Sequence, residues 1–126
     1  DRSWGGQHDC QQVDNGNIIL FANGSEQPTA EHSRILEIDP ISKKTVWQYK
    51  GQPPITFFSA RVSGVHRMAN GNTFICEGMH GRMGEIVWEY VSPFYNTVQK
   101  VGTTNQIFRA RKYSKKDPRL SKILQN

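Results

Sequence analysis

The feature that most constrains the fold is an internal repeat of two short segments. The stretch VDNGNIILF (Val13–Phe21) is matched by MANGNTFIC (Met68–Cys76), and KTVWQY (Lys44–Tyr49) is matched by EIVWEY (Glu85–Tyr90). Each unit predicts a strand, an Asn-Gly turn, a second strand, a gap and a strand ending in Trp-x-Tyr. Repeats of about 40–50 residues built from short antiparallel strands are typical of propeller blades. A β-sandwich is the alternative, but its strands need not repeat their sequence.

The apolar runs are short, rich in β-branched and aromatic residues, and bounded by turn residues, whereas helical periodicity is nearly absent. One short helix is expected to begin at Asp117, with Pro118 in its first turn. The sequence therefore predicts an all-β chain with a short C-terminal helix. The expected strands are Asn17–Ala22, Arg34–Ile38, Thr45–Tyr49, Arg61–Met68, Asn72–Gly78, Glu85–Val91 and Asn105–Tyr113.

The repeat predicts a partial β-propeller over residues 1–113, followed by a basic C-terminal tail at 114–126. The two blade-like units span about residues 8–50 and 58–91, and a closing strand spans about 104–113. Because a propeller commonly needs about 4–8 blades, upstream sequence or other chains would have to complete the ring. The second unit is short, since Met83 is followed at once by Gly84 and leaves almost no room for a third strand. A segment missing at this junction is the interpretation that the sequence favours.

Composition limits the function only broadly. The 126 residues are enough for one modest domain with its own core. The formal charge is +5, and much of the basic excess lies at Arg109–Lys122, which is usual for a solvated end but could contact an acidic partner. We recognise no nucleic-acid motif, signal peptide or membrane span, so neither a nucleic-acid partner nor a membrane span is predicted.

Several residues invite a chemical role that the pattern supports weakly. Cys10 and Cys76 make neither a disulfide framework nor a zinc site by themselves, and we expect buried, inert thiols. His66 and His80 could join Cys76 at a metal, but no fourth ligand offers itself, so no metal is predicted. Asn23 begins an Asn-Gly-Ser sequence that fits the N-glycosylation pattern.

Four segments occur in an order that resembles the C-terminal third of bacterial arylsulfate sulfotransferases. They are QHDCQQVDNGNIILFANG, HSRILEIDPISKKTVWQYKG, FFSARVSGVHRMANGNTFICEG and NQIFRARKY, and the resemblance covers about Trp4 to Tyr113. It implies part of a six-bladed propeller, periplasmic or otherwise exported, that needs no cofactor. It also implies transfer of a sulfuryl group from a phenolic sulfate ester to a phenol acceptor. The chain departs from the family where FANG replaces the commoner FDNG, so Ala22 stands in place of a carboxylate.

The resemblance places the catalytic histidine of the family's Gln-His motif on His8, which implies a nucleophile that is transiently sulfated. Neutral imidazole has a free lone pair at physiological pH, and a covalent intermediate gives ping-pong kinetics. Arg34 is the candidate for stabilising the sulfate oxygens, while pairing with Glu31 or Glu37 is its structural alternative. We discount Asp9 as a partner of His8, because adjacent strand residues point to opposite faces.

Two other functions stay open on the sequence alone. The chain could be a non-catalytic propeller segment that binds a partner or stabilises an assembly. It could also be a quinoprotein-type propeller with a redox cofactor, although residues that would bind such a cofactor are not recognisable. The residues that would bind the aryl group are not assigned.

Overall fold

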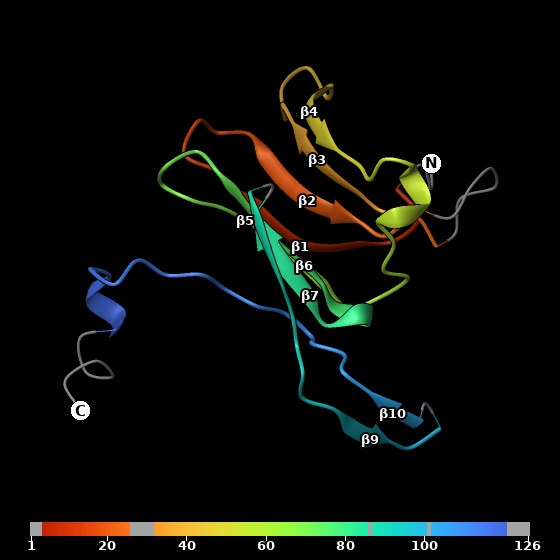
Figure 1. Ribbon diagram of the computed structural model, residues 1–126. Coiled ribbons are helices and arrows are strands. Elements are labelled where there is room, and N and C mark those ends of the chain that lie inside the picture. The colour runs from red at the N-terminus through yellow and green to blue at the C-terminus, as the bar shows by residue number, and fades with distance from the viewer. Residues whose placement is uncertain (1–3, 26–31, 86, 101, 121–126) are drawn as a thin grey trace.

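The computed structural model describes residues 4–25, 32–85, 87–100 and 102–120 (Figure 1). The strands form two four-stranded antiparallel sheets in sequence order, β1-β2-β3-β4 and β5-β6-β7-β8, and one hairpin, β9-β10. The all-β prediction is therefore confirmed. The elements are β1 (Gln7–Gln12), β2 (Ile18–Ala22), β3 (Arg34–Ile38), β4 (Thr45–Tyr49), η1 (Pro54–Thr56), β5 (Ser63–Arg67), β6 (Thr73–Glu77), η2 (Gly78–His80), β7 (Arg82–Glu85), β8 (Trp88–Val91), β9 (Asn96–Val98), β10 (Gly102–Thr104) and η3 (Pro118–Leu120).

The two Asn-Gly sequences form matching turns, which confirms the repeat at the level of the backbone. Between β1 and β2, Gly16 donates its N–H to the carbonyl oxygen of Val13 at 2.9 Å. Between β5 and β6, Gly71 donates its N–H to the carbonyl oxygen of Met68 at 2.9 Å. The φ angles of the two glycines are +88° and +85°, a left-handed conformation that glycine adopts at little cost.

The second sheet has four strands although its sequence is short. Arg82–Glu85 is itself the third strand, pairing with β6 on one side and with β8 on the other. Glu85 faces Trp88 across the β7–β8 pair, so only positions 86 and 87 separate the two strands. The expected single strand Glu85–Val91 is wrong, and no missing segment is needed, because two residues suffice to connect antiparallel strands.

The expected closing strand is also wrong. Residues 105–113 contain no strand, and the last strand, β10, pairs instead with β9 in a hairpin that the sequence did not predict. This hairpin projects from the rest of the molecule (Figure 1). The segment Asn105–Tyr113, which we call the crossing segment, runs back along the second sheet, where Ile107 donates its N–H to Gly78 O at 2.8 Å. The crossing segment is therefore an extended stretch that contacts the second sheet at isolated positions and forms no strand.

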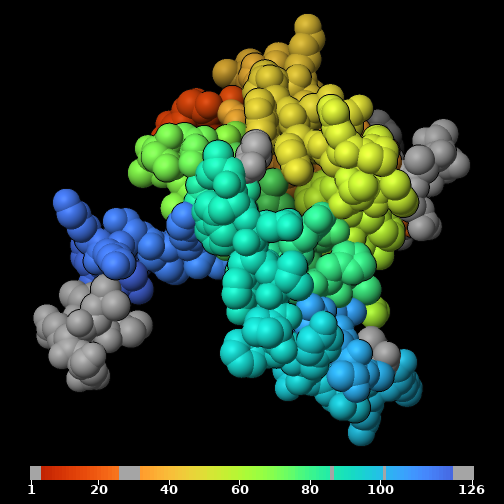
Figure 2. Space-filling model, viewed as in Figure 1, coloured from red at the N-terminus to blue at the C-terminus, as the bar shows by residue number. Residues whose placement is uncertain are grey.

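The main core lies between the two large sheets and joins them into one body. The β9–β10 hairpin and the C-terminal part of the chain stand out from this body at the surface (Figure 2). Phe57, from the connection between the sheets, packs against Phe21 and Tyr49 with ring centroids 5.3 Å away in each case. The buried members of this core are Ile19, Phe21, Ile35, Phe57, Val65 and Ile75. The two units of the repeat are therefore packed face to face.

The described residues include only the first part of the expected C-terminal helix. A 3₁₀ turn covers Pro118–Leu120, and Asp117 accepts the N–H of Arg119 at its Oδ1, 2.9 Å away. The remaining residues of the expected helix lie outside the described part of the chain. Among the described helices, none has the length and apolarity that crossing a membrane requires.

The carboxylate of Glu37, in β3, accepts hydrogen bonds from three side chains. Glu37 accepts hydrogen bonds from Asn17 Nδ2 at 2.8 Å and from Arg67 Nη2 at 2.6 Å. The guanidinium of Arg67, a residue of β5, also lies 4.7 Å from the ring centroid of Trp47. Burial raises the pKa of Glu37, but the hydrogen bonds from Asn15, Asn17 and Arg67 outweigh it and lower the pKa.

The second sheet repeats this arrangement with the crossing segment in place of β5. Glu85 accepts a hydrogen bond from Asn72 Nδ2 at 2.7 Å and pairs with Lys112 Nζ. The Lys112 ammonium lies 4.7 Å from the ring centroid of Trp88. Lys112 thus takes, against the second sheet, the place that Arg67 takes against the first. The crossing segment therefore contacts the second sheet much as β5 contacts the first.

Candidate functional site

Polar side chains gather where β1, β5 and the crossing segment meet. This β1–β5 polar cluster consists of His8, Asp9, Gln11, Asn23, His66, Arg109 and Arg111. A bulge in β1 builds it, because His8 pairs with Phe21 while Gln11 pairs with Ile19. His8 and Gln11 are therefore both on the face that packs against the second sheet, although three positions separate them.

His8 is held by a buried amide. Its Nδ1 lies 2.7 Å from Asn23 Oδ1, and Asn23 is only 1% exposed. The amide nitrogen of Asn23 donates to Ser59 O at 2.6 Å and to Ser63 Oγ at 3.3 Å. The orientation of the Asn23 amide is thus fixed by acceptors on the far side of the side chain.

This network determines the tautomer of His8. Since the Asn23 nitrogen is used as a donor, Oδ1 is the atom that faces the imidazole, and it can only accept. Nδ1 of His8 therefore carries the proton, and Nε2 of the neutral ring keeps its lone pair. That is the arrangement a nitrogen nucleophile needs.

Asp9 connects three parts of the chain rather than orienting His8. Its φ of +51° places it in the bulge, so the strict alternation on which we discounted it does not hold. Oδ2 accepts the N–H of Val65 at 3.0 Å. Oδ1 accepts hydrogen bonds from Arg109 Nη1 at 3.0 Å and Arg111 Nη2 at 2.7 Å, and the side chain is 5% exposed.

The two arginines give the cluster an excess positive charge. Arg111 Nη1 also lies 3.3 Å from Nδ1 of His66 and 3.3 Å from Oε1 of Gln11. Burial, with the charge of Arg111 next, lowers the pKa of His66 and so favours the neutral imidazole. Sequence reasoning assigned Arg109 and Arg111 no individual role. The one sequence signal for the two arginines was their spacing of two positions, which places both on the same face of an extended segment.

The structure does not bring Arg34 to His8. Arg34 pairs with Ala22 across β2–β3, one position away from Phe21, which pairs with His8. Because neighbouring positions of a strand point to opposite faces, Arg34 belongs to the other face of the first sheet. Of its two expected partners, Glu37 is bound by Arg67, and Glu31 lies outside the described residues.

The remaining candidates divide by burial. Cys76 is fully buried, and burial raises the pKa of its thiol to about 11, whereas Cys10 is exposed, which corrects the expectation for that residue. His80 has an exposed side chain at 61%, and within the described part of the chain no three His, Cys, Asp or Glu residues are grouped to hold a metal. The burial of Asn23 removes it as a glycosylation acceptor in this fold.

Comparisons of the chain with protein-family models, with curated proteins and with solved structures gave no match.

Proposed function

We propose that this chain is part of a β-propeller that transfers a sulfuryl group from an aryl sulfate ester to a phenol, with His8 as the nucleophile. The observation that carries the proposal is the 2.7 Å contact between His8 Nδ1 and Asn23 Oδ1, because it leaves Nε2 free to attack. Two four-stranded meanders in sequence order support the propeller assignment. The motif order that resembles arylsulfate sulfotransferases supports the choice of reaction.

The proposed reaction has two half-reactions. In the first, Nε2 of His8 attacks sulfur, an N–S bond forms, and the bond between sulfur and the aryl oxygen breaks to release a phenolate. In the second, the hydroxyl oxygen of a phenol attacks the same sulfur, its proton passes to solvent, and the imidazole is released. While sulfur is bound, the ring keeps its Nδ1 proton and gains positive charge, which Asn23 Oδ1 stabilises as an acceptor.

Cations must surround the sulfate oxygens, because charge builds on the leaving oxygen in a loose transition state. We assign this role to Arg109 and Arg111 rather than to Arg34. Both bind the carboxylate of Asp9, the residue that follows His8, and Arg109 has a half-exposed side chain at 47%. Arg34 lies on the opposite face of the sheet.

The same resemblance leads us to propose an exported, periplasmic location, a reaction without a cofactor, and further blades contributed by additional polypeptide. The contact of Lys112 with Glu85 repeats, on the second sheet, the contact of Arg67 with Glu37 on the first. This repetition supports a further blade, because the first strand of a following sheet would lie where the crossing segment lies.

Sulfation of His8 tests the proposal directly. The protein as isolated, together with any associated chains, is incubated with 4-nitrophenyl sulfate, and its peptides are analysed by mass spectrometry. We expect one added sulfuryl group on the peptide that contains His8, together with release of 4-nitrophenolate. The adduct should vanish in His8→Ala and persist in His80→Ala, which changes an exposed histidine elsewhere. A folded protein that forms no adduct would contradict the proposal.

A second candidate function is a non-catalytic binding or assembly segment. It is favoured by the exposed aromatic side chains of β8, since Trp88 and Tyr90 remain 40% and 43% exposed on the sheet that the crossing segment covers only in part. In that case the His8→Ala variant would associate with partners as the unmodified chain does. Sedimentation velocity of both proteins measures this.

A further inference from the structure

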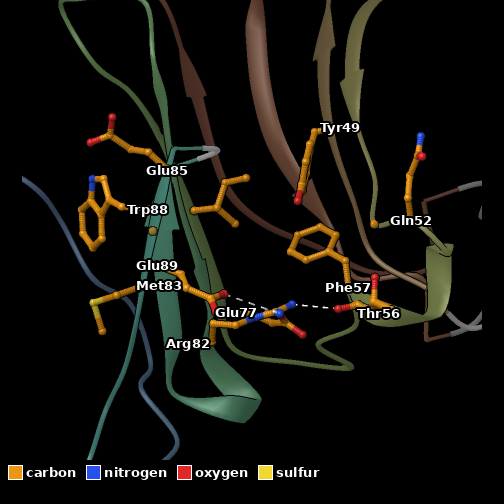
Figure 3. Close-up of a pocket in the computed structure, with 13 residues that line it drawn as sticks. Tyr49, Gln52, Thr56, Phe57, Glu77, Arg82, Met83, Glu85, Trp88 and Glu89 are labelled. Atoms are coloured by element: carbon orange, nitrogen blue, oxygen red, sulfur yellow. Dashed lines mark hydrogen bonds and ion pairs between the residues drawn. The ribbon is translucent and has the colours of Figure 1, made fainter.

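We propose that the cavity between the outer strands of the two large sheets binds a small arylalkylammonium ion, which is one aromatic ring joined by a short chain to a protonated amine. The cavity has a volume of about 260 Å³ and lies between β4 with the Gly51–Phe57 connection on one side and β7–β8 on the other (Figure 3). It is separate from the β1–β5 polar cluster, and the inference does not depend on the proposed function.

The last three strands of the second sheet form one side of this cavity. Ile75, Gly84 and Glu89 stand opposite one another in a single row across β6, β7 and β8. A side chain at Gly84 would collide with the backbone of Trp88 and Glu89, so the glycine allows β8 to lie close to β7. Met83 and Trp88 extend from their strands to the side away from Phe57 (Figure 3).

One wall of the cavity is aromatic. Phe57 and Tyr49 meet edge to face, with ring centroids 5.3 Å apart and an interplanar angle of 69° (Figure 3). Phe57 is 3% exposed, so its position is fixed by the core. A ligand ring placed beside this pair gains both apolar contact and ring–ring contact. The small volume limits the ligand to about one ring with a short chain.

The charges around the cavity select a cation. Glu77 is 5% exposed and is neutralised by Arg82, whose Nε donates to Oε2 at 2.8 Å. Arg82 Nη2 also donates to Thr56 O at 2.8 Å. Glu89 is 67% exposed, and its closest ion pair, with Arg82 Nη1, is loose at 3.9 Å. One guanidinium and three carboxylates line the cavity. Arg82 neutralises Glu77 and Lys112 pairs with Glu85, so one negative charge is left, on Glu89.

An ammonium group on the ligand would therefore pair with Glu89 at the rim while its ring lies against Tyr49. The ring of Tyr49 adds a cation–π contribution if the ammonium passes over its face. An aromatic acid would instead meet three carboxylates and a guanidinium that already binds Glu77 and the carbonyl oxygen of Thr56. A ligand of the same shape that carries a negative charge is therefore disfavoured.

The test uses 2-phenylethylamine as the probe, with 3-phenylpropionate and n-butylamine as comparisons. Saturation-transfer NMR and titration calorimetry on the whole chain should give a Kd of about 1 mM for 2-phenylethylamine. Binding of either comparison compound should be at least about fivefold weaker. Added salt should weaken binding of the amine, because Glu89 is exposed.

Two variants locate the site. Glu89→Gln should weaken binding of 2-phenylethylamine about fivefold, whereas Asp14→Asn, which removes an exposed carboxylate elsewhere, should leave it unchanged. Tyr49→Leu should weaken it by about fivefold through loss of the ring. Circular dichroism confirms that each variant is folded. The proposal is overturned if the folded chain binds no amine, if 3-phenylpropionate binds equally well, or if Glu89→Gln has no effect.

Discussion

Among single residues, Asn23 has the largest influence on the candidate site. Its sequence context offered only a glycosylation pattern, yet the side chain is buried and joins His8 to Ser59 and Ser63. It thereby connects the first sheet to the start of the second. A loop residue that follows an apolar strand gives no sequence signal for such a role, because the acceptors lie 36 and 40 positions away.

Removing this amide should destabilise the fold. We expect Asn23→Ala to lower the free energy of unfolding by about 2 kcal/mol, because the buried carbonyl of Ser59 loses a donor. Urea unfolding monitored by circular dichroism measures the change. The exposed amide of Gln12 provides the control, and Gln12→Ala should cost less than about 0.5 kcal/mol. Equal effects of the two substitutions would refute the assigned role of Asn23.

The two thiols should differ in reactivity. Cys10 is exposed, whereas Cys76 is buried with its thiol pKa raised to about 11. At about pH 8, iodoacetamide should therefore modify Cys10 in the native protein and Cys76 only after unfolding, because the thiolate is the reactive form. Peptide mass spectrometry reads out both sites. Rapid native labelling of Cys76 would show that the second sheet opens readily.

The carboxyl of Glu85 predicts a pH dependence. Hydrogen bonds from Lys112 and Asn72 hold its pKa below the ordinary value of 4.5. A carboxyl whose pKa is lowered in the folded state contributes stability that is complete above 4.5 and disappears as pH falls through the lowered value. The loss of stability between about pH 7 and pH 3 should be smaller in Lys112→Met than in the unmodified chain, measured by urea unfolding. An identical loss in both proteins would argue against this pair.

At the scale of elements, the sequence predicted strands of five residues and failed where strands have only three or four. The expected Arg34–Ile38 and Thr45–Tyr49 coincide with β3 and β4. The pair β7–β8 was missed because Arg82–Glu85 contains a glycine and too few apolar residues to show alternation. Its pairing with β6 comes from the sheet around it, which is a tertiary effect that no local pattern contains.

The β1–β5 polar cluster was predictable only in part. The motif order identified His8, and β1 does contain it. The bulge at Asp9 and the return of Arg109 and Arg111 were not predictable, since each depends on contacts about 100 positions apart in the chain. Residues that meet through such distant contacts leave little trace in local composition.

The crossing segment should be held mainly by its charges. We expect Lys112→Met to increase amide hydrogen exchange in residues 105–113, because the Glu85 pair and the contact with Trp88 are both lost. The matched change Arg67→Met lies in a paired strand and should increase exchange there much less. Exchange followed by mass spectrometry compares the two variants. Equal protection of the segment in both would mean that Lys112 does not hold it.

For the whole molecule, the shared core predicts cooperative unfolding. Phe57 packs on the first sheet and belongs to the same buried cluster as Val65 and Ile75 of the second. Phe57→Ala should therefore lower the free energy of unfolding by about 3–4 kcal/mol while keeping a single transition. Tryptophan fluorescence and far-ultraviolet circular dichroism should give the same midpoint. Separate midpoints would mean that the two sheets unfold independently.

The charge pairs of Asp9 also set the order of events during synthesis. Asp9 leaves the ribosome before Arg109 and Arg111, which follow 100 and 102 positions later. A nascent chain that has already paired its two large sheets must therefore keep this carboxylate solvated until the crossing segment has been translated. Chains folding from the N-terminus onward thus acquire the β1–β5 polar cluster as a late step, after the main core has closed.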